Sequence, residues 1–268
     1  TPFVAPFFIL FFGMCIGDVG YGLILAGAFW LALKKLDLSD NVKRFLRLFM
    51  YCGIVSIVVG IFTAGYFGID SFRIALYGEE AQLPTFIKFP GTVDLLYDPI
   101  PFMIICLALG LIHISIGVAI EMHDNIRHNS VWLGICEQGT TLLFWFGIAV
   151  AAFGYGIGLE PIGLMGVVIA GAGIAGVIFL SNIQSKSIPG KFFGGLYNLY
   201  GLLASTIGDV ASYLRLYALG LATIAIAMVV NIMASLMWDV PLLGIIVLLV
   251  ILLGGHVFNL AVSFLSAF

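Results

Sequence analysis

The feature that most constrains this chain is a series of apolar stretches, each long enough to cross a lipid bilayer. They lie at approximately 3–33, 45–67, 99–121, 131–155, 162–181, 195–236 and 241–268. A spanning helix needs roughly 20 mostly apolar residues to cross about 30 Å of hydrocarbon. Charged residues make up 9% of the chain, against about 25% in soluble domains, so a water-soluble fold is excluded. The sequence predicts an all-α, polytopic membrane protein.

The first and the sixth stretch raise questions of helix number and tilt. Residues 3–33 contain the glycine-rich segment GMCIGDVGYG. They form either one helix or a short hairpin, and glycines at this density favour a break over a continuous helix. Asp18 is expected to serve this turn by capping or by holding backbone amides. About forty residues at 195–236 would span about 60 Å as a helix, which requires tilting, bending or a start along the interface. We expect about eight transmembrane helices, the last two long and strongly tilted.

Basic residues predict the orientation of the chain, because cytoplasmic loops carry an excess of Lys and Arg. The loops at 34–47, 123–130 and 182–191 carry this excess and fall on the side predicted to be cytoplasmic. The acidic loop at 68–98 is predicted to lie outside. No basic run is long enough to suggest a nucleic-acid partner, so the expected surroundings are the lipid bilayer.

Arg215 is the most informative charge, because it lies inside the apolar segment GDVASYLRLYALGLATIAIAMVVN. A guanidinium keeps its proton, and burying one costs at least about 2.5 to 3.5 kcal/mol on insertion scales. A stripe of small and weakly polar residues shares its helix face at 100° per residue: Ser205, Gly208, Ser212, Ala222 and Thr223. We interpret Arg215 as an ion-translocation residue. The alternative is a structural arginine paired with backbone carbonyls or with Asp209, which lies about 120° around the helix.

A second polar stripe occurs in the final stretch. His256, Asn259, Ser263 and Ser266 recur at intervals of three and four residues, which places them on one face of an apolar helix. Such side chains relay protons, hold water or form interhelical hydrogen bonds. Glu137, beside Gln138, is either a hydrogen-bonding group inside the bundle or part of an aqueous entry, whereas His113 is predicted to be a satisfied core histidine.

Several sequence signatures of catalysis are absent. The chain has no GxxxxGKS/T phosphate loop, HExxH motif, clustered Cys/His metal set or GxSxG elbow. Its four cysteines lie in apolar runs without CxxC spacing, as expected of inert packing residues. We therefore expect no catalytic site, no metal and no cofactor.

With these residues in view, the chain resembles the membrane domain of subunit a, called subunit I in archaea and bacteria, of V-type and A-type rotary ATPases. The resemblance rests on three segments: PFFILFFGMCIGDVGYGLIL, GDVASYLRLYALGLA and GHVFNLAVSFLSAF. It implies a stator with an eight-helix membrane part facing a rotating proteolipid ring, which favours the hairpin at 3–33. A peripheral six-helix bundle would then occupy 1–192, and two tilted helices at 193–268 would face the ring.

The resemblance also implies roles for single residues. Arg215 would face the ion-binding carboxylates of the ring. The inner half-channel candidates are Ser205, Asp209 and Ser212, and the outer candidates are Thr223, His256, Asn259 and Ser263, with Glu137 as a further half-channel candidate. Eukaryotic relatives carry a histidine at the position of Thr223 and a glutamate at that of Ser263, so their proton path does not carry over directly.

The resemblance places further parts of the machine outside these residues. It implies a soluble amino-terminal domain that contacts central-stalk and peripheral-stalk subunits, and a carboxyl-terminal segment with a second arginine after Phe268. The expected location is a prokaryotic plasma membrane. Two other functions fit the residues alone: a secondary transporter that binds an anionic substrate through Arg215, and a structural membrane anchor. The choice between proton and sodium, and between ATP hydrolysis and synthesis, stays open.

Overall fold

The chain folds into helices throughout the part that the structure, a computed structural model, describes: residues 4–63, 65–68, 95, 99–128, 131–180, 188–238, 240 and 243–268. Six helices in this part are long and apolar enough to cross a membrane. Together with the shorter α1 and α2, they confirm an all-α fold of about eight helices, six of which are candidate membrane spans. Many of their exposed side chains are large and apolar, such as Val168 and Leu253, as lipid-facing surfaces require. The loops predicted at 68–98 and 182–191 lie largely outside the described residues.

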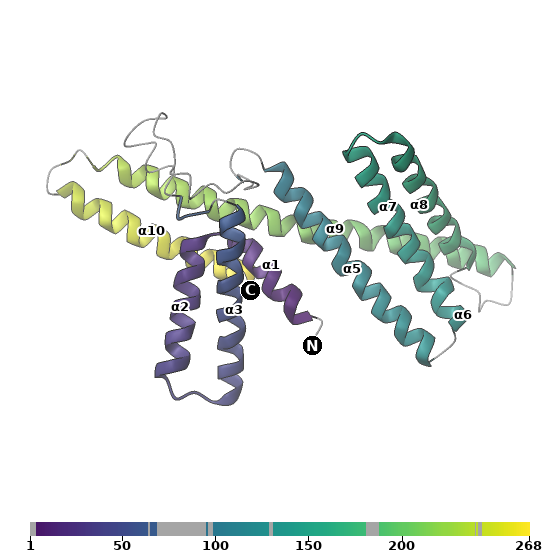
Figure 1. Cartoon of the computed structure of the whole chain (residues 1–268), viewed down its shortest axis with the longest axis horizontal. Helices are drawn as coiled ribbons and strands as arrows, with labels where there is room; N and C mark the ends of the chain where they lie inside the picture. The colour runs from purple at the N-terminus through teal and green to yellow at the C-terminus, as the bar shows by residue number, and fades with distance from the viewer. Residues whose placement is uncertain are drawn as a thin grey trace. The chain divides into compact units, whose positions relative to one another are not determined.

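The chain divides into two compact units, and each is described by itself (Figure 1). Unit 1 comprises Thr1–Ile104 and Leu214–Phe268, and unit 2 comprises Ile105–Tyr213. These units reflect contacts within the chain. The predicted division at residue 192 has a different reason: residues 193–268 are expected to face the ring, and residues 1–192 are not. That division stays a prediction.

Unit 1 begins with a helix break at Gly17 and Asp18. The helix α1 (Val4–Ile16) ends before Gly17, which has a φ of 51°, and α2 (Val19–Lys35) begins after Asp18. A positive φ is accessible to glycine without a side-chain clash. Both helices pack against α3 (Asp40–Phe62), and α2 and α3 lie side by side (Figure 1). The residues from Val4 to Lys35 therefore form two helices, which agrees with the break that the glycine-rich segment favoured and excludes one continuous helix.

An aromatic core joins the two ends of the chain within unit 1. Phe12 of α1, Phe49 of α3 and Phe264 of α10 (Leu243–Ala267) have ring centroids 5.1 to 5.5 Å apart. Rings at this separation contribute attraction beyond the area that they bury. This core docks the last helix of the chain on the first helices, where it meets the polar groups described below.

Unit 2 contains α5 (Ile100–His128, from Ile105), α6 (Val131–Gly134), the π-helix η1 (Ile135–Gly139), α7 (Thr140–Gly156) and α8 (Glu160–Leu180). Small residues bring α7 and α8 together: an added Cβ at Gly166 would collide with the backbone nitrogen of Ala151. Gly147 and Gly173 meet the backbones of Ala170 and Phe144 in the same way. Close backbone contact of this kind is a general mode of helix association in membranes.

The contact at Gly166 makes a stability prediction. We expect Gly166→Ala to lower the free energy of unfolding by about 1 to 3 kcal/mol, because the new methyl group displaces a packed backbone. Gly171→Ala, on the same helix with open space around it, is the matched control and should be neutral or slightly stabilising. Thermal unfolding of the purified chain in detergent measures both. Equal melting temperatures for the two variants would contradict the packing described here.

The longest element is α9 (Ile188–Ser235), an uninterrupted helix of 48 residues. Its residues up to Tyr213 belong to unit 2 and those from Leu214 to unit 1. At about 1.5 Å per residue this helix is about 72 Å long, more than twice the thickness of the hydrocarbon core. The predicted long helix is thus continuous, and its length requires a strong tilt or a portion outside the hydrocarbon.

Candidate functional site

Arg215 has an exposed side chain on α9. The apolar residues that follow it continue the helix without interruption to Ser235. Among the residues that the structure describes, no ion pair involves the Arg215 guanidinium. Because the side chain is exposed, a group that does not belong to this chain has access to it.

The three inner half-channel candidates lie on the part of α9 that belongs to unit 2. Ser205 and Ser212 are exposed, and Asp209 is half-buried. The hydroxyl groups of Ser205 and Ser212 donate to the carbonyl oxygens of Leu202 and Gly208, both at 2.9 Å. These bonds to the helix itself satisfy the hydroxyl donors while the oxygen lone pairs still face the surroundings.

Three of the outer candidates meet in a buried cluster of unit 1. Thr223 is 2% exposed, and its Oγ1 lies 2.8 Å from Oγ of Ser263. Asn259 is fully buried, and its Nδ2 donates to the carbonyl oxygen of Thr223 at 2.8 Å. Ser263 Oγ also donates to Asn259 Oδ1 at 3.3 Å. The cluster therefore ties α9 to α10, while Ser266, predicted on the same stripe, is exposed.

His256 joins this cluster through Tyr21 of α2. Asn259 Nδ2 donates to the Tyr21 hydroxyl oxygen at 2.9 Å, and that oxygen lies 2.7 Å from His256 Nδ1. On its other side, His256 Nε2 lies 3.1 Å from Asn231 Oδ1. Asn231 Nδ2 donates to the carbonyl oxygens of Phe67 and Gly68. We call the set Tyr21, Thr223, Asn231, His256, Asn259 and Ser263 the buried polar network.

The donors of this network fix the tautomer of His256. Asn231 gives its amide hydrogens to two carbonyl groups, so its oxygen must be the acceptor toward His256 Nε2. His256 therefore carries its hydrogen on Nε2 and accepts from the Tyr21 hydroxyl at Nδ1. The hydrogen bonds therefore run in one direction: Asn259 donates to Tyr21, Tyr21 to His256, His256 to Asn231, and Asn231 to the carbonyl group of Phe67.

Asp18 holds the network in position from the helix break. It is 1% exposed and accepts from the backbone N–H of Tyr21 at 2.9 Å and of Phe67 at 2.7 Å. These are the residues that present a hydroxyl group and a carbonyl group to His256 and Asn231. The prediction that Asp18 caps the turn and holds backbone amides is confirmed.

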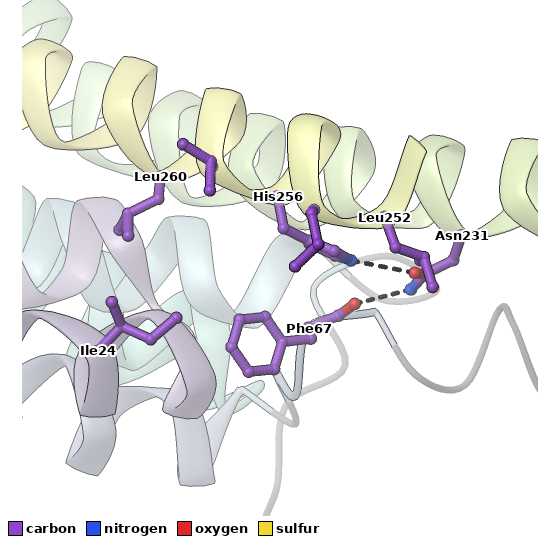
Figure 2. A pocket seen from close by; sticks show the side chains of 8 residues that line it. Ile24, Phe67, Asn231, Leu252, His256 and Leu260 are labelled. Atoms are coloured by element: carbon purple, nitrogen blue, oxygen red, sulfur yellow. Dashed lines mark hydrogen bonds between the residues drawn. The ribbon is translucent and has the colours of Figure 1, made fainter. Parts of the chain in front are cut away.

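A pocket of about 410 Å³ opens beside the network in unit 1. Figure 2 shows His256 and Asn231 at its polar edge, with Asn231 bonded to the carbonyl group of Phe67. The rest of its lining is apolar and comes mainly from α10 and α2: Ile24, Leu252, Leu253, Val257 and Leu260. The pocket borders His256 and Asn231, but its surface is almost entirely apolar.

The remaining candidates lie in unit 2. Glu137 lies in the π-helix η1, is half-buried and lines a second pocket together with Glu121 and Gln138. His113 Nδ1 lies 2.8 Å from the Tyr213 hydroxyl, so this histidine is satisfied, as predicted. Within the described residues, no group of three or more His, Cys, Asp or Glu side chains could hold a metal ion.

The sequence interpretation missed Tyr21 and Asn231, the two residues that connect His256 to the rest of the network. Asn231 could have been found, because it is a lone amide in the apolar run AIAMVVNIM and such groups need partners in a membrane. Tyr21 carried no such signal. It lies in the glycine-rich segment, and its partner His256 is 235 residues away in the chain.

Comparisons with known proteins identify the family, although no family model matches the chain. The whole chain is 32% identical to the A-type ATP synthase subunit I of Methanocaldococcus jannaschii and 29% identical to that of Pyrococcus abyssi. Over 97% of its length it is 26% identical to the V-type ATP synthase subunit I of Borreliella burgdorferi. It spans 41%, 38% and 43% of the lengths of these relatives, respectively. The chain is therefore homologous over its full length to subunit I of A-type and V-type ATP synthases, and its six long apolar helices fit an integral membrane protein.

Proposed function

We propose that this chain is the stator of the membrane sector of a rotary ATPase or ATP synthase, in which Arg215 faces the carboxylates of a rotating proteolipid ring. The observation that carries this proposal is the exposed guanidinium of Arg215 on a long apolar helix. A charge at such a position is costly and marks an ion pathway or a charged partner. The small and polar neighbours Ser205 and Ser212, also exposed, allow water or another helix to approach.

The coupling follows from charge. A protonated ring carboxylate is neutral and can rotate through lipid, whereas an ionised carboxylate cannot. Arg215 attracts each arriving carboxylate and favours its ionised form, because a nearby cation stabilises the negative charge. The cation leaves the carboxylate on one side, and Arg215 blocks direct passage between two offset half-channels. A cation therefore completes the crossing on the ring, which couples rotation to transport.

The half-channels are assigned from the two groups of candidates. Ser205, Asp209 and Ser212 line the inner half-channel, and the pocket beside His256 belongs to the outer one. The buried polar network itself does not conduct protons along its length, because the amides of Asn231 and Asn259 do not titrate. We assign it the role of holding α9 and α10 in register beside the outer path.

The proposal implies partners and a location. The ring supplies the carboxylates, and stalk subunits hold the stator through the other parts of subunit I. The membrane is a prokaryotic plasma membrane, with residues 34–47, 123–130 and 182–191 in the cytoplasm. Helix ends rather than loops make up much of these ranges, because α2 ends at Lys35, α3 begins at Asp40, α5 ends at His128 and α9 begins at Ile188. The relatives named above are A-type and V-type ATP synthase subunits of archaea and a bacterium, which supports this assignment.

Disulfide crosslinking in the intact complex tests the proposal. We expect Ser212→Cys to form a disulfide with a ring subunit that carries a cysteine one helical turn from its carboxylate, since Ser212 is exposed on the face of Arg215. The native cysteines are buried and should not compete. Val168→Cys, on α8 and 71% exposed, is the control that should stay uncrosslinked.

The opposite pattern, crosslinking at position 168 and none at position 212, would refute the stator surface. Two other results would favour the alternative functions. Binding of an anionic substrate by the chain without the ring would indicate a secondary transporter. Full assembly without any transport role for Arg215 would indicate a structural anchor.

A further inference from the structure

A strongly basic surface lies in unit 1, where α2 ends and α3 begins. Five of the eleven Lys and Arg residues of the chain fall within residues 34–47, although the whole chain has a net charge of -3. Only two acidic residues, Asp37 and Asp40, lie in the same range. We call the five basic residues the basic patch: Lys34, Lys35, Lys43, Arg44 and Arg47.

Helix packing brings the two halves of the basic patch together. α2 ends at Lys35, Ser39 caps the start of α3, and the two helices lie side by side (Figure 1). The two lysines of α2 therefore lie beside the first turns of α3, which carry the other three basic residues. Four of the five side chains are exposed, and Lys43 is half-buried. The patch is thus one surface at the connected end of a helix pair.

The chain supplies no counter-charge to this surface. Within the ranges that the structure describes, no ion pair engages any of the five basic side chains, although Asp37 and Asp40 are exposed between them. Lys43 and Arg44 lie at the first turn of α3, where the partial positive charge of a helix start disfavours cations. An anionic group from outside the chain would therefore stabilise this end of the helix pair.

The residues around the patch mark the level of a membrane surface. α2 has no charged residue before Lys34, and α3 has none after Arg47. Trp30 is 51% exposed, and the Lys34 ammonium group lies 5.1 Å from the centre of its ring. Tryptophan is enriched at the boundary between the hydrocarbon and the headgroups of a bilayer. The basic patch therefore lies at the depth of the headgroups, which long basic side chains can reach.

Charge and depth together select the occupant. A phospholipid whose headgroup has no amine carries a net negative charge, and each Lys or Arg near a membrane surface strengthens its attraction by about fivefold. A zwitterionic headgroup has no such advantage. Ammonium groups bind phosphate as point charges, and guanidinium groups bind it through a planar fork. The patch contains both kinds of donor, so a phosphate oxygen finds a partner at any approach.

We propose that the basic patch binds the headgroups of anionic phospholipids and holds α2 and α3 at a fixed depth in the membrane. The site depends only on unit 1, and it is independent of Arg215 and of the ring. It gives a function to a surface that has no role in the proposed ion path.

Energy transfer to labelled lipids tests the proposal on the purified chain, in phosphatidylcholine nanodiscs with a minor share of phosphatidylglycerol. Ser39→Cys carries the donor, because Ser39 is exposed beside the patch and the four native cysteines are buried. We expect an acceptor on phosphatidylglycerol to be enriched at position 39 over the same acceptor on phosphatidylcholine. Lys43→Gln together with Arg47→Gln should reduce this preference by at least about tenfold, since each charge contributes about fivefold.

Two control variants separate charge from structure. Lys43→Arg together with Arg47→Lys keeps both charges and should match the wild type. Arg127→Gln removes an exposed basic residue of α5 and should leave the preference at position 39 unchanged. Salt tests the wild-type patch without a change in the basic residues. At about 1 M salt the Debye length is about 3 Å, so the preference should disappear.

Three results would overturn the lipid site. The first is equal enrichment of both lipids at position 39 in the wild type. The second is a phosphatidylglycerol preference that survives both the glutamine pair and high salt. The third is loss of the preference when the chain is assembled with the other subunits, because an acidic protein surface would then cover the patch. Transport measurements on Arg215 variants would be unaffected by any of these results.

Discussion

Arg215→Ala should reduce coupled cation transport by at least about a hundredfold, as loss of a preorganised charge does at other sites. Without the guanidinium, nothing in the proposed mechanism favours the ionised ring carboxylate at the junction of the half-channels. The measurement is ATP-driven cation uptake by the reconstituted complex. Arg215→Lys should recover little, because an ammonium group is compact and strongly hydrated and lacks the planar fork of a guanidinium.

We expect Arg215→Ala to lose transport but to keep the stability of the wild type. A charged side chain in an apolar helix costs about 2.5 to 3.5 kcal/mol on insertion scales, so alanine should leave assembly and the melting temperature intact or slightly raised. Arg44→Ala, which removes an exposed arginine at the start of α3, is the control and should transport normally. Retention of pumping by Arg215→Ala, or a collapse of assembly, would contradict an arginine that acts on the ring.

Asp18→Ala should cause the largest loss of stability among single substitutions in unit 1. The change leaves the backbone N–H groups of Tyr21 and Phe67 without their acceptor. At about 1 to 3 kcal/mol for each unpaired group, we expect the free energy of unfolding to fall by about 2 to 6 kcal/mol. Asp18→Asn should lie between alanine and the wild type, because its single carbonyl oxygen can accept from only one of the two N–H groups.

Chemical or thermal unfolding of the purified chain in detergent measures this effect. Asp37→Ala, at an exposed carboxylate after the same helix, is the control and should leave stability unchanged. A wild-type melting temperature for Asp18→Ala would show that the helix break holds without its carboxylate. Loss of transport in Asp18→Asn with full stability would instead point to a role for Asp18 in the ion path.

The helices were largely predictable because each depends on local composition. The break at Gly17 agrees with the glycines around Asp18, and a long helix was predicted from the apolar run at 195–236. Its start was not, because α9 begins seven residues earlier, at Ile188. The π turn at Glu137 was not predictable, because its residues have no pattern that distinguishes it from an ordinary helical turn. The stripe of His256, Asn259 and Ser263 was visible from its spacing, but its partners were not.

What the sequence determined by itself is the membrane fold, its helices and the isolated charge of Arg215, since a bilayer imposes these constraints on each segment separately. Tertiary structure alone decided that Tyr21 meets His256, that Asp18 holds Phe67, and that Asn259 joins α9 to α10. These contacts pair residues that are 36 to 235 positions apart. Hydrogen bonding in the buried interior depends on which helices pack together, and periodicity within one helix carries no information about the neighbour that it will meet.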